Sequence, residues 1–294
     1  MRKKCGLALS GGGIKAYCQV GVVKFLKESG FKLDAYAGTS MGSIVATLLA
    51  HDIPITQVEN SLLKIQKIVM DENLLAPSNA QVFPLLTRSI TGLIDPSRFV
   101  RIIEEEFEQY NIKYIKDVKF PLVITSVDLI SGKIVYFTNR KELIKSQYKY
   151  FIIMDDVLLI DAIRASCSFP MVFTTMDYRD MQLVDGGVLM NIPVAPLKSM
   201  GLEKVLSISM DSFNEYQGST KVTEIGARIV DLMANHSNNA MLSLSDFNIN
   251  VFDKKIGIFS FGQGKNAINL GFQVAQIEKK SILEFKNTLN KFFF

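Results

Sequence analysis

The chain is poor in the residues that form disulfide bonds and zinc sites. Its 294 residues include two histidines, three cysteines and no tryptophan. Cys5, Cys18 and Cys167 form no C-x-x-C pair, so no disulfide framework is expected and reduced thiols in a cytoplasmic setting are the default. With only two histidines, a zinc site is not expected either.

A long apolar run is also absent. No stretch approaches the ~18 consecutive apolar residues of a transmembrane helix. The basic start MRKK precedes an apolar segment, residues 5–9, which is shorter than the ~7 to 15 residues of a signal-peptide core. We interpret this segment as a first strand and expect a cytoplasmic protein that is soluble or bound peripherally to a membrane.

Basic residues only slightly outnumber acidic ones. The 33 basic and 29 acidic residues give a formal charge of +4, which is too mild to indicate a nucleic-acid partner. It would not oppose contact with an anionic membrane. The length and the 48% hydrophobic content predict a substantial core in a single domain, residues 1–294. The oligomeric state is left open.

Apolar strand-like runs alternate with helical patterns along the chain. The strands are expected at residues 5–9, 33–37, 122–127, 134–138, 182–184, 205–210 and 256–261. The helices are expected at residues 14–29, 40–51, 55–70, 97–110, 157–166, 223–247 and 274–292. This alternation predicts a three-layer α/β/α fold with a mostly parallel central sheet and helices on both faces. Ligands bind such sheets at the carboxyl ends of the strands.

Residues 71–95 interrupt this alternation. The segment contains Pro77, Pro84 and Gly92 but is rich in leucine, isoleucine and phenylalanine. It is a candidate lid or lipid-facing insertion, and a buried irregular connection is the alternative.

The motif GTSMG, residues 38–42, places Ser40 between Gly38 and Gly42. It follows a strand-like run and precedes a helix-like run. In a nucleophile elbow, the serine occupies a strained turn between a strand and a helix, and glycines keep side chains out of the corner. Ser40 is therefore a candidate nucleophile.

A second motif, SGGGIKA, joins the first strand to the first helix. The amides of Gly11, Gly12 and Gly13 can converge on an anion, either a phosphate or the oxyanion of an acyl-transfer intermediate. A P-loop is excluded because the chain has no Gly-Lys-Ser/Thr. A dinucleotide-binding oxidoreductase stays open, since Gly11-x-Gly13-x-x-Ala16 with Asp34 resembles the Rossmann pattern. Asp34 begins an apolar run, however, where a ribose-binding acid should end a strand.

A third motif, LVDGG, places Asp185 before Gly186 and Gly187. Taken alone, an Asp-Gly pair between apolar residues is typical of a hairpin turn. Alternatively, Asp185 ends a strand and serves as the base that a serine hydroxyl needs. Ser40, Asp185 and His236 also follow the triad order of α/β-hydrolases, so a triad esterase is an alternative. We interpret His236 and His51 as surface or helix-end residues.

Together, these motifs resemble the patatin-like phospholipase family. That family has a glycine-rich G-G-G-x-[R/K]-G loop, a G-x-S-x-G elbow and a later D-G-[G/A], in the order found here. The stretches ALSGGGIKAYCQVGVVKFL, AGTSMGSIVATLLA and ASCSFP also look like family blocks, so the resemblance covers residues 5–210. Two positions depart from the pattern: Ala16 replaces the last loop glycine, and Lys15 keeps the positive charge of the usual arginine.

The resemblance implies a lipid acyl hydrolase of the phospholipase A or lysophospholipase type that acts on a phospholipid or lysophospholipid, without a metal or an organic cofactor. Ser40 would be the nucleophile of a Ser–Asp dyad, Asp185 its base, and Gly11, Gly12 and Gly13 the oxyanion hole. The supporting residues are Lys15, Gly38, Gly42, Gly186 and Gly187. Head group, acyl position and the choice between hydrolysis and transacylation are left open. A dyad also predicts no acid limb of the pH profile near ~6.5, where an unperturbed histidine titrates.

Overall fold

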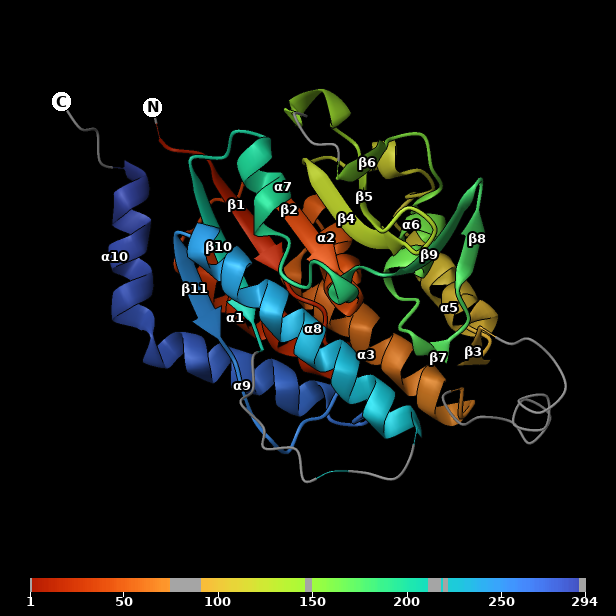
Figure 1. The fold of residues 1–294 in the computed structure, drawn as a ribbon. Coiled ribbons are helices and arrows are strands. Elements are labelled where there is room, and N and C mark those ends of the chain that lie inside the picture. Colours follow the sequence, from red (N-terminus) through yellow and green to blue (C-terminus); the bar gives the residue numbers. More distant parts are fainter. Residues whose placement is uncertain (1, 75–90, 146–149, 211–217, 219–221, 291–294) are drawn as a thin grey trace, which may run out of the picture.

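The computed structural model describes residues 2–74, 91–145, 150–210, 218 and 222–290. A sheet lies between two sets of helices (Figure 1), so the predicted three-layer α/β/α fold is confirmed. The strand order is β11–β10–β1–β2–β4–β5–β6, and β9 also pairs with β4. The bounds are β1 (Cys5–Leu9), β2 (Ala35–Thr39), β4 (Leu122–Asp128), β5 (Lys133–Thr138), β6 (Phe151–Met154), β8 (Met176–Tyr178), β9 (Met181–Asp185), β10 (Lys204–Ser209) and β11 (Phe247–Asn250).

The sheet is parallel through its centre and mixed at one side. Strands β11, β10, β1, β2 and β4 run parallel. Strands β5 and β9 pair antiparallel with β4, and β8 pairs antiparallel with β9. Strands β1, β2 and β4 are buried along their whole length, as expected of parallel strands that are covered on both faces.

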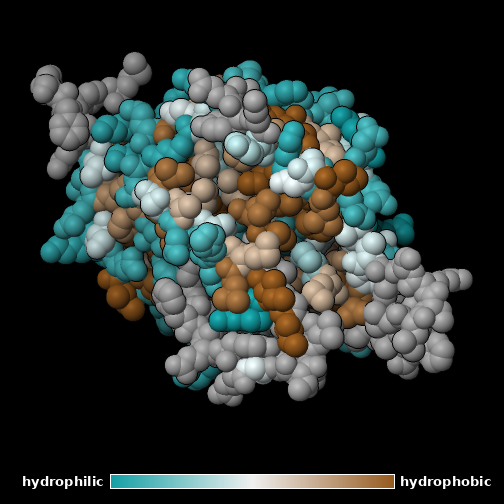
Figure 2. Space-filling view, viewed as in Figure 1, coloured by the Kyte–Doolittle hydropathy of each residue, from teal (hydrophilic) through white to brown (hydrophobic). Residues whose placement is uncertain are grey.

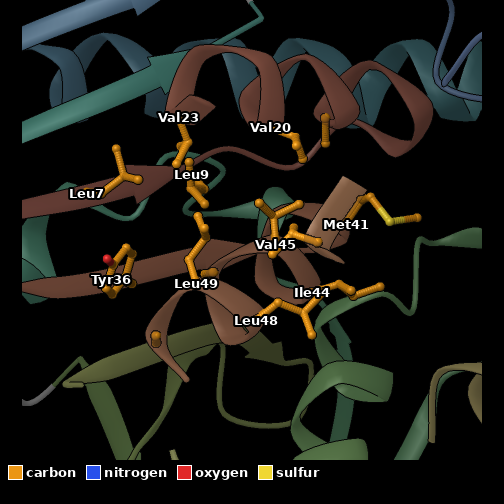
Figure 3. Close-up of a cluster of buried hydrophobic side chains, with 14 of the residues drawn as sticks. Leu7, Leu9, Val20, Val23, Tyr36, Met41, Ile44, Val45, Leu48 and Leu49 are labelled. Carbon is orange, nitrogen blue, oxygen red and sulfur yellow. The ribbon is translucent and has the colours of Figure 1, made fainter. Parts of the chain in front are cut away.

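Two apolar cores fix the layers. On one face, Leu7 and Leu9 of β1 pack between α1 (Cys18–Glu28) and α2 (Met41–Ala50), as Figure 3 shows for Val23 and Leu49. This larger core also includes side chains of α3 (Ile55–Asp71), α5 (Ser97–Glu108), α6 (Leu159–Ser166), α9 (Gly264–Ile277) and α10 (Lys279–Asn290). On the other face, α7 (Val194–Ser199) and the end of α8 (Val222–Leu244) cover a smaller core. Both faces of the central strands are therefore shielded from water.

The predictions for the last third of the chain are partly wrong. Residues 256–261 form turns rather than a strand, because Gly257 and Gly262 interrupt the alternation; Gly262 has a positive φ of 100°. The last strand is instead β11, where Phe247 and Ile249 alternate with polar residues beside β10. The helix predicted at residues 274–292 is two helices, α9 and α10, which meet at Glu278.

The candidate lid, residues 71–95, falls mostly outside the described residues, which omit 75–90. Asp71 ends α3, and β3 (Gly92–Ile94) pairs with β7 (Met171–Phe173) in a small separate sheet. Within the described ranges, no helix combines the length and the apolar character needed to span a membrane.

Candidate active site

Strands β2 and β9 end beside consecutive residues of β4. Strand β2 runs parallel to β4 and ends with Thr39 beside Thr125. Strand β9 runs antiparallel along β4 and ends with Asp185 beside Ser126. Because the two strands approach each other head-on, Ser40 and Asp185 come together although 145 residues separate them in the sequence.

Ser40 occupies a sharp corner between β2 and α2. Its φ of 52° and ψ of −131° lie where residues with a side chain are rarely found, and such backbone strain is common at functional sites. The flanking glycines allow the corner to close. A Cβ on Gly38 would lie 2.3 Å from the Gly42 oxygen, and one on Gly42 would lie 2.4 Å from the Ser10 oxygen.

Asp185 is buried, with 2% of its surface exposed. Its carboxylate accepts a hydrogen bond from the Gly187 amide at 2.7 Å. Burial raises the pKa of Asp185 to about 6, and hydrogen bonds from the Ser40 side chain and the Gly187 amide oppose that rise. The carboxyl group therefore gives up its proton near pH 6.

The hairpin interpretation of LVDGG is wrong. Asp185 ends β9 and is followed by the short 3-10 helix η5 (Gly186–Val188) rather than by a second strand. Gly186 is needed for packing, since a Cβ there would lie 2.4 Å from the Thr125 hydroxyl oxygen. The hairpin lies earlier, between β8 and β9, where Arg179 has a positive φ of 54°.

The glycine loop lies directly beside Ser40. A Cβ on Gly11 would lie 3.1 Å from the Ser40 Cβ. The Gly11 amide donates to the Asn191 carbonyl at 3.3 Å, so it is not free to bind an oxyanion. Among the described residues, the amides of Gly12 and Gly13 have no acceptor. Both glycines have positive φ, 155° and 56°, which places their backbone in a region that favours glycine.

A pocket with a cavity volume of about 110 Å³ opens above this arrangement. Its polar lining includes Ser40, Asp185, Lys15 and the three loop glycines. Apolar side chains form much of the remaining wall, among them five phenylalanines: Phe99, Phe169, Phe173, Phe259 and Phe261. A small polar centre with apolar walls is typical of a site for an apolar ligand.

Three residues beside the centre were missed by the sequence analysis. The Ser166 hydroxyl accepts the Ser40 amide at 2.8 Å. The Asn191 carbonyl anchors the glycine loop, and its side chain lines the pocket. Cys167 also lines the pocket, and burial raises the pKa of its thiol, with a further contribution from Asp185. Only the ASCSFP block marked Ser166 and Cys167 in the sequence, and nothing there indicated their contacts.

The residues on which the triad and the dinucleotide-binding alternatives depended lie away from Ser40 and the glycine loop. His236 is exposed on α8 and does not line the pocket. His51 follows α2, whose ten residues place it ~15 Å along the helix axis from Ser40, and burial lowers its pKa. Asp34 precedes β2, at the opposite end of that strand from Ser40, and pairs with Arg2 at 2.6 Å. Asp34 is therefore not placed to bind a ribose at the glycine loop.

The fold and the pocket define an α/β protein with a largely apolar pocket at the ends of its parallel strands. The model of the patatin-like phospholipase family matches residues 7–198. The chain belongs to the patatin-like phospholipase family, and the resemblance seen in the sequence is confirmed.

Several curated proteins are similar to this chain. An NTE family protein of Mycobacterium bovis is 25% identical over 215 residues, which cover 71% of this chain and 49% of that protein. Lysophospholipase NTE1 of Scheffersomyces stipitis is 28% identical over 210 residues, or 71% of this chain and 12% of that protein. The chain thus spans about half or less of the length of these relatives.

Among solved structures, VipD from Legionella pneumophila has a similar fold. The TM-score is 0.51 at 12% sequence identity, and the match covers 95% of this chain and 67% of that one. At this identity, the likeness shows the fold alone.

Proposed function

We propose that this protein is a lipid acyl hydrolase of the phospholipase A or lysophospholipase type, which cleaves carboxylic esters with a Ser40–Asp185 dyad. The observation that carries the proposal is the meeting of a strained, partly exposed serine with a buried carboxylate, beside two unpaired amides and under apolar walls. Each of these features has a distinct place in acyl transfer.

In the first half-reaction, Asp185 accepts the hydroxyl proton of Ser40 while Oγ attacks the ester carbonyl. The amides of Gly12 and Gly13 hold the resulting oxyanion. The C–O bond to the alcohol then breaks, and Asp185 returns the proton to the leaving oxygen. In the second half-reaction, Asp185 takes a proton from water, the hydroxide attacks the acyl-enzyme, and Ser40 recovers its proton as the acid leaves.

The raised pKa of Asp185 suits this role. A carboxylate with a pKa near its reference value of ~3.9 is a weak base for a hydroxyl. With a pKa of about 6, Asp185 would be roughly 90% ionised at pH 7 and would bind the serine proton more strongly. Burial therefore serves the chemistry at some cost to stability.

Lipid as the substrate class rests on two observations. The pocket walls carry five phenylalanines, which suit an acyl chain better than a polar acid. The family is named for phospholipases, and similar proteins include a lysophospholipase. No observation in the described part of the chain favours the dinucleotide alternative, because Asp34 is directed to Arg2 and Cys5.

A fluorophosphonate probe tests the proposal directly, since it reacts with an activated serine. Intact-protein mass spectrometry should show one adduct on the wild type and none on Ser40→Ala. Asp185→Asn should retain under a hundredth of kcat/KM, whereas His236→Gln and His51→Gln should each keep at least a third. Labelling of Ser40→Ala would contradict the nucleophile, and a dead His236→Gln enzyme with an intact fold would favour the triad.

Product analysis fixes the substrate class. Phosphatidylcholine, lysophosphatidylcholine and a soluble p-nitrophenyl ester would be compared with the same enzyme. Release of free fatty acid from a phospholipid or lysophospholipid supports the proposal. Turnover of the soluble ester alone would limit the protein to general esterase activity, and transfer of the acyl group to an added alcohol would identify a transacylase.

A further inference from the structure

Helix α8 carries an apolar stripe that faces away from the protein. Ile225, Ile229, Leu232 and Met233 are between 39% and 53% exposed. Their spacing of i, i+4, i+7 and i+8 places them on one side of the helix, the pattern that usually faces a core. Here that side faces outward.

Just beyond the stripe, the described residues on the inward side of the helix are small or polar. Ala234 and Asn235 line the pocket, and Asn238 is buried. Met241 and Leu242, further along this inward side, pack against the smaller core. The outward stripe is therefore not needed to hold α8 on the protein. Its exposed apolar side chains are available to bind another apolar surface.

The helix that carries the stripe also lines the catalytic pocket. Through Ala234 and Asn235, α8 forms one wall of the pocket, and Phe259 forms another. Phe259 is itself 47% exposed and packs edge-on against Phe169 at 6.3 Å. Figure 2 shows hydrophobic residues along the face that α8 crosses in Figure 1. Phe259 is thus both exposed and part of the pocket lining.

The loop that carries Phe259 adds positive charge. Lys254 and Lys255 are exposed on this loop, and neither forms an ion pair with another described residue. Phe252, on the same loop, is exposed as well. Exposed apolar side chains combined with lysines suit the surface of an anionic bilayer, where basic groups near the headgroups add to apolar burial.

We propose that Ile225, Ile229, Leu232, Met233 and Phe259 form a docking surface, here called the α8 docking surface, for a bilayer that contains anionic phospholipid. Docking through it would place the pocket mouth against the lipid, so that an acyl chain could enter without crossing water. A second copy of the chain would instead cover the mouth and block the substrate. The proposal rests on the lipid hydrolase function proposed above.

Vesicle binding tests the α8 docking surface separately from catalysis. Ser40→Ala protein would be sedimented with vesicles of phosphatidylcholine containing about one third phosphatidylglycerol, an anionic lipid. Adding Ile229→Ser and Leu232→Ser should weaken the partition coefficient by about tenfold or more, since two exposed apolar side chains lose their burial in lipid. Adding Lys254→Glu and Lys255→Glu should weaken binding mainly at low salt.

Ile277→Ser is the matched control. Ile277 is 84% exposed at the end of α9 and does not line the pocket, so its loss should leave vesicle binding unchanged. Circular dichroism would verify that each variant is folded. In protein that retains Ser40, the Ile229→Ser, Leu232→Ser variant should hydrolyse a soluble p-nitrophenyl ester at the wild-type rate and vesicle lipid more slowly.

The outcomes separate the two proposals. Vesicle binding that depends on Ile229 and Leu232, without hydrolysis of any ester, would support docking and contradict the proposed function. Equal binding of the double variant and its parent, or no binding by either, would overturn the docking proposal. So would analytical ultracentrifugation that shows a dimer dissociated by the same substitutions, because the stripe would then belong to a second copy.

Discussion

The Ser40 amide donates a hydrogen bond of 2.8 Å to the hydroxyl of Ser166, the last residue of α6. The contact joins the strained elbow to a helix that lies 126 residues further along the chain. Ser166 is fully buried, so no water can replace the acceptor without rearrangement. The elbow is therefore held from outside as well as by its own glycines.

Ser166→Ala should lower kcat by ten- to a hundredfold, because the unpaired amide costs ~1 to 3 kcal/mol and the elbow can relax from its strained conformation. The rate of fluorophosphonate labelling should fall in parallel, while KM for a soluble ester changes little. Stopped-flow labelling and steady-state kinetics would measure both.

Ser168→Ala is the control for this prediction. Ser168 is equally buried, and its hydroxyl donates to the Arg164 carbonyl at 2.9 Å rather than contacting Ser40. It should lower the melting temperature about as much as Ser166→Ala does, yet keep most of the labelling rate. If both variants lose labelling equally, Ser166 is only a packing residue.

The two free loop amides can be tested at Gly12. A Cβ there meets the Met210 methyl group at 2.8 Å, the movable end of a side chain, whereas a Cβ on Gly13 meets the Ile258 carbonyl oxygen at 2.2 Å. Gly12→Ala should thus preserve the overall fold, but a φ of 155° disfavours a residue with a Cβ, so the loop backbone should shift and misplace the Gly12 amide. We expect kcat to fall by more than tenfold, since loss of an oxyanion donor typically costs ~10² to 10³. Gly13→Ala should lower the melting temperature by several degrees more. Full activity in Gly12→Ala would show that the loop serves only as a turn.

The pH profile should have an acid limb near pH 6. Asp185 must be ionised to act as a base, and its pKa is about 6, so kcat/KM should fall as the pH drops through that value. The expectation of no limb near ~6.5 is therefore not supported, since a buried carboxylate titrates where a histidine would. The limb should persist in a His51→Gln, His236→Gln double variant. Its disappearance there would assign it to a histidine.

The sequence predicted which residues belong to the candidate site but not how they come together in the fold. Gly38 and Gly42 around Ser40 predicted an elbow because only a strand-to-helix corner needs glycine at both positions, and the fold has that corner. That Asp185 would lie beside Ser40 depended on β9 pairing antiparallel with the end of β4, a long-range register that no local pattern in LVDGG encodes.

Because local patterns do not encode long-range contacts, some predictions from the sequence were wrong. Gly11, Gly12 and Gly13 looked equivalent in the sequence, but the Gly11 amide is paired with Asn191, a partner 180 residues away. Residues 256–261 are rich in apolar side chains, as a buried strand would be, although in the fold Ile258, Phe259 and Phe261 line the pocket. Local periodicity records which side chains are buried, and it does not distinguish a sheet from a cavity wall.

Asp185→Asn should inactivate the protein and stabilise it at neutral pH. The native carboxyl group takes up its proton near pH 6, whereas in the unfolded chain it does so near ~3.9. Between these values the native state binds more protons, so the wild type loses stability as the pH rises through this window, by up to about 3 kcal/mol.

Asparagine carries no charge, and its oxygen can still accept from Gly187. The melting temperature of the variant should therefore exceed that of the wild type by a margin that is small at pH 4 and largest above pH 7. Calorimetry across that range would measure the margin, with the exposed Asp180→Asn as a control that should show none. A margin independent of pH would mean that Asp185 is not held in its costly ionised form, and the argument for its role as the base would lose its physical support.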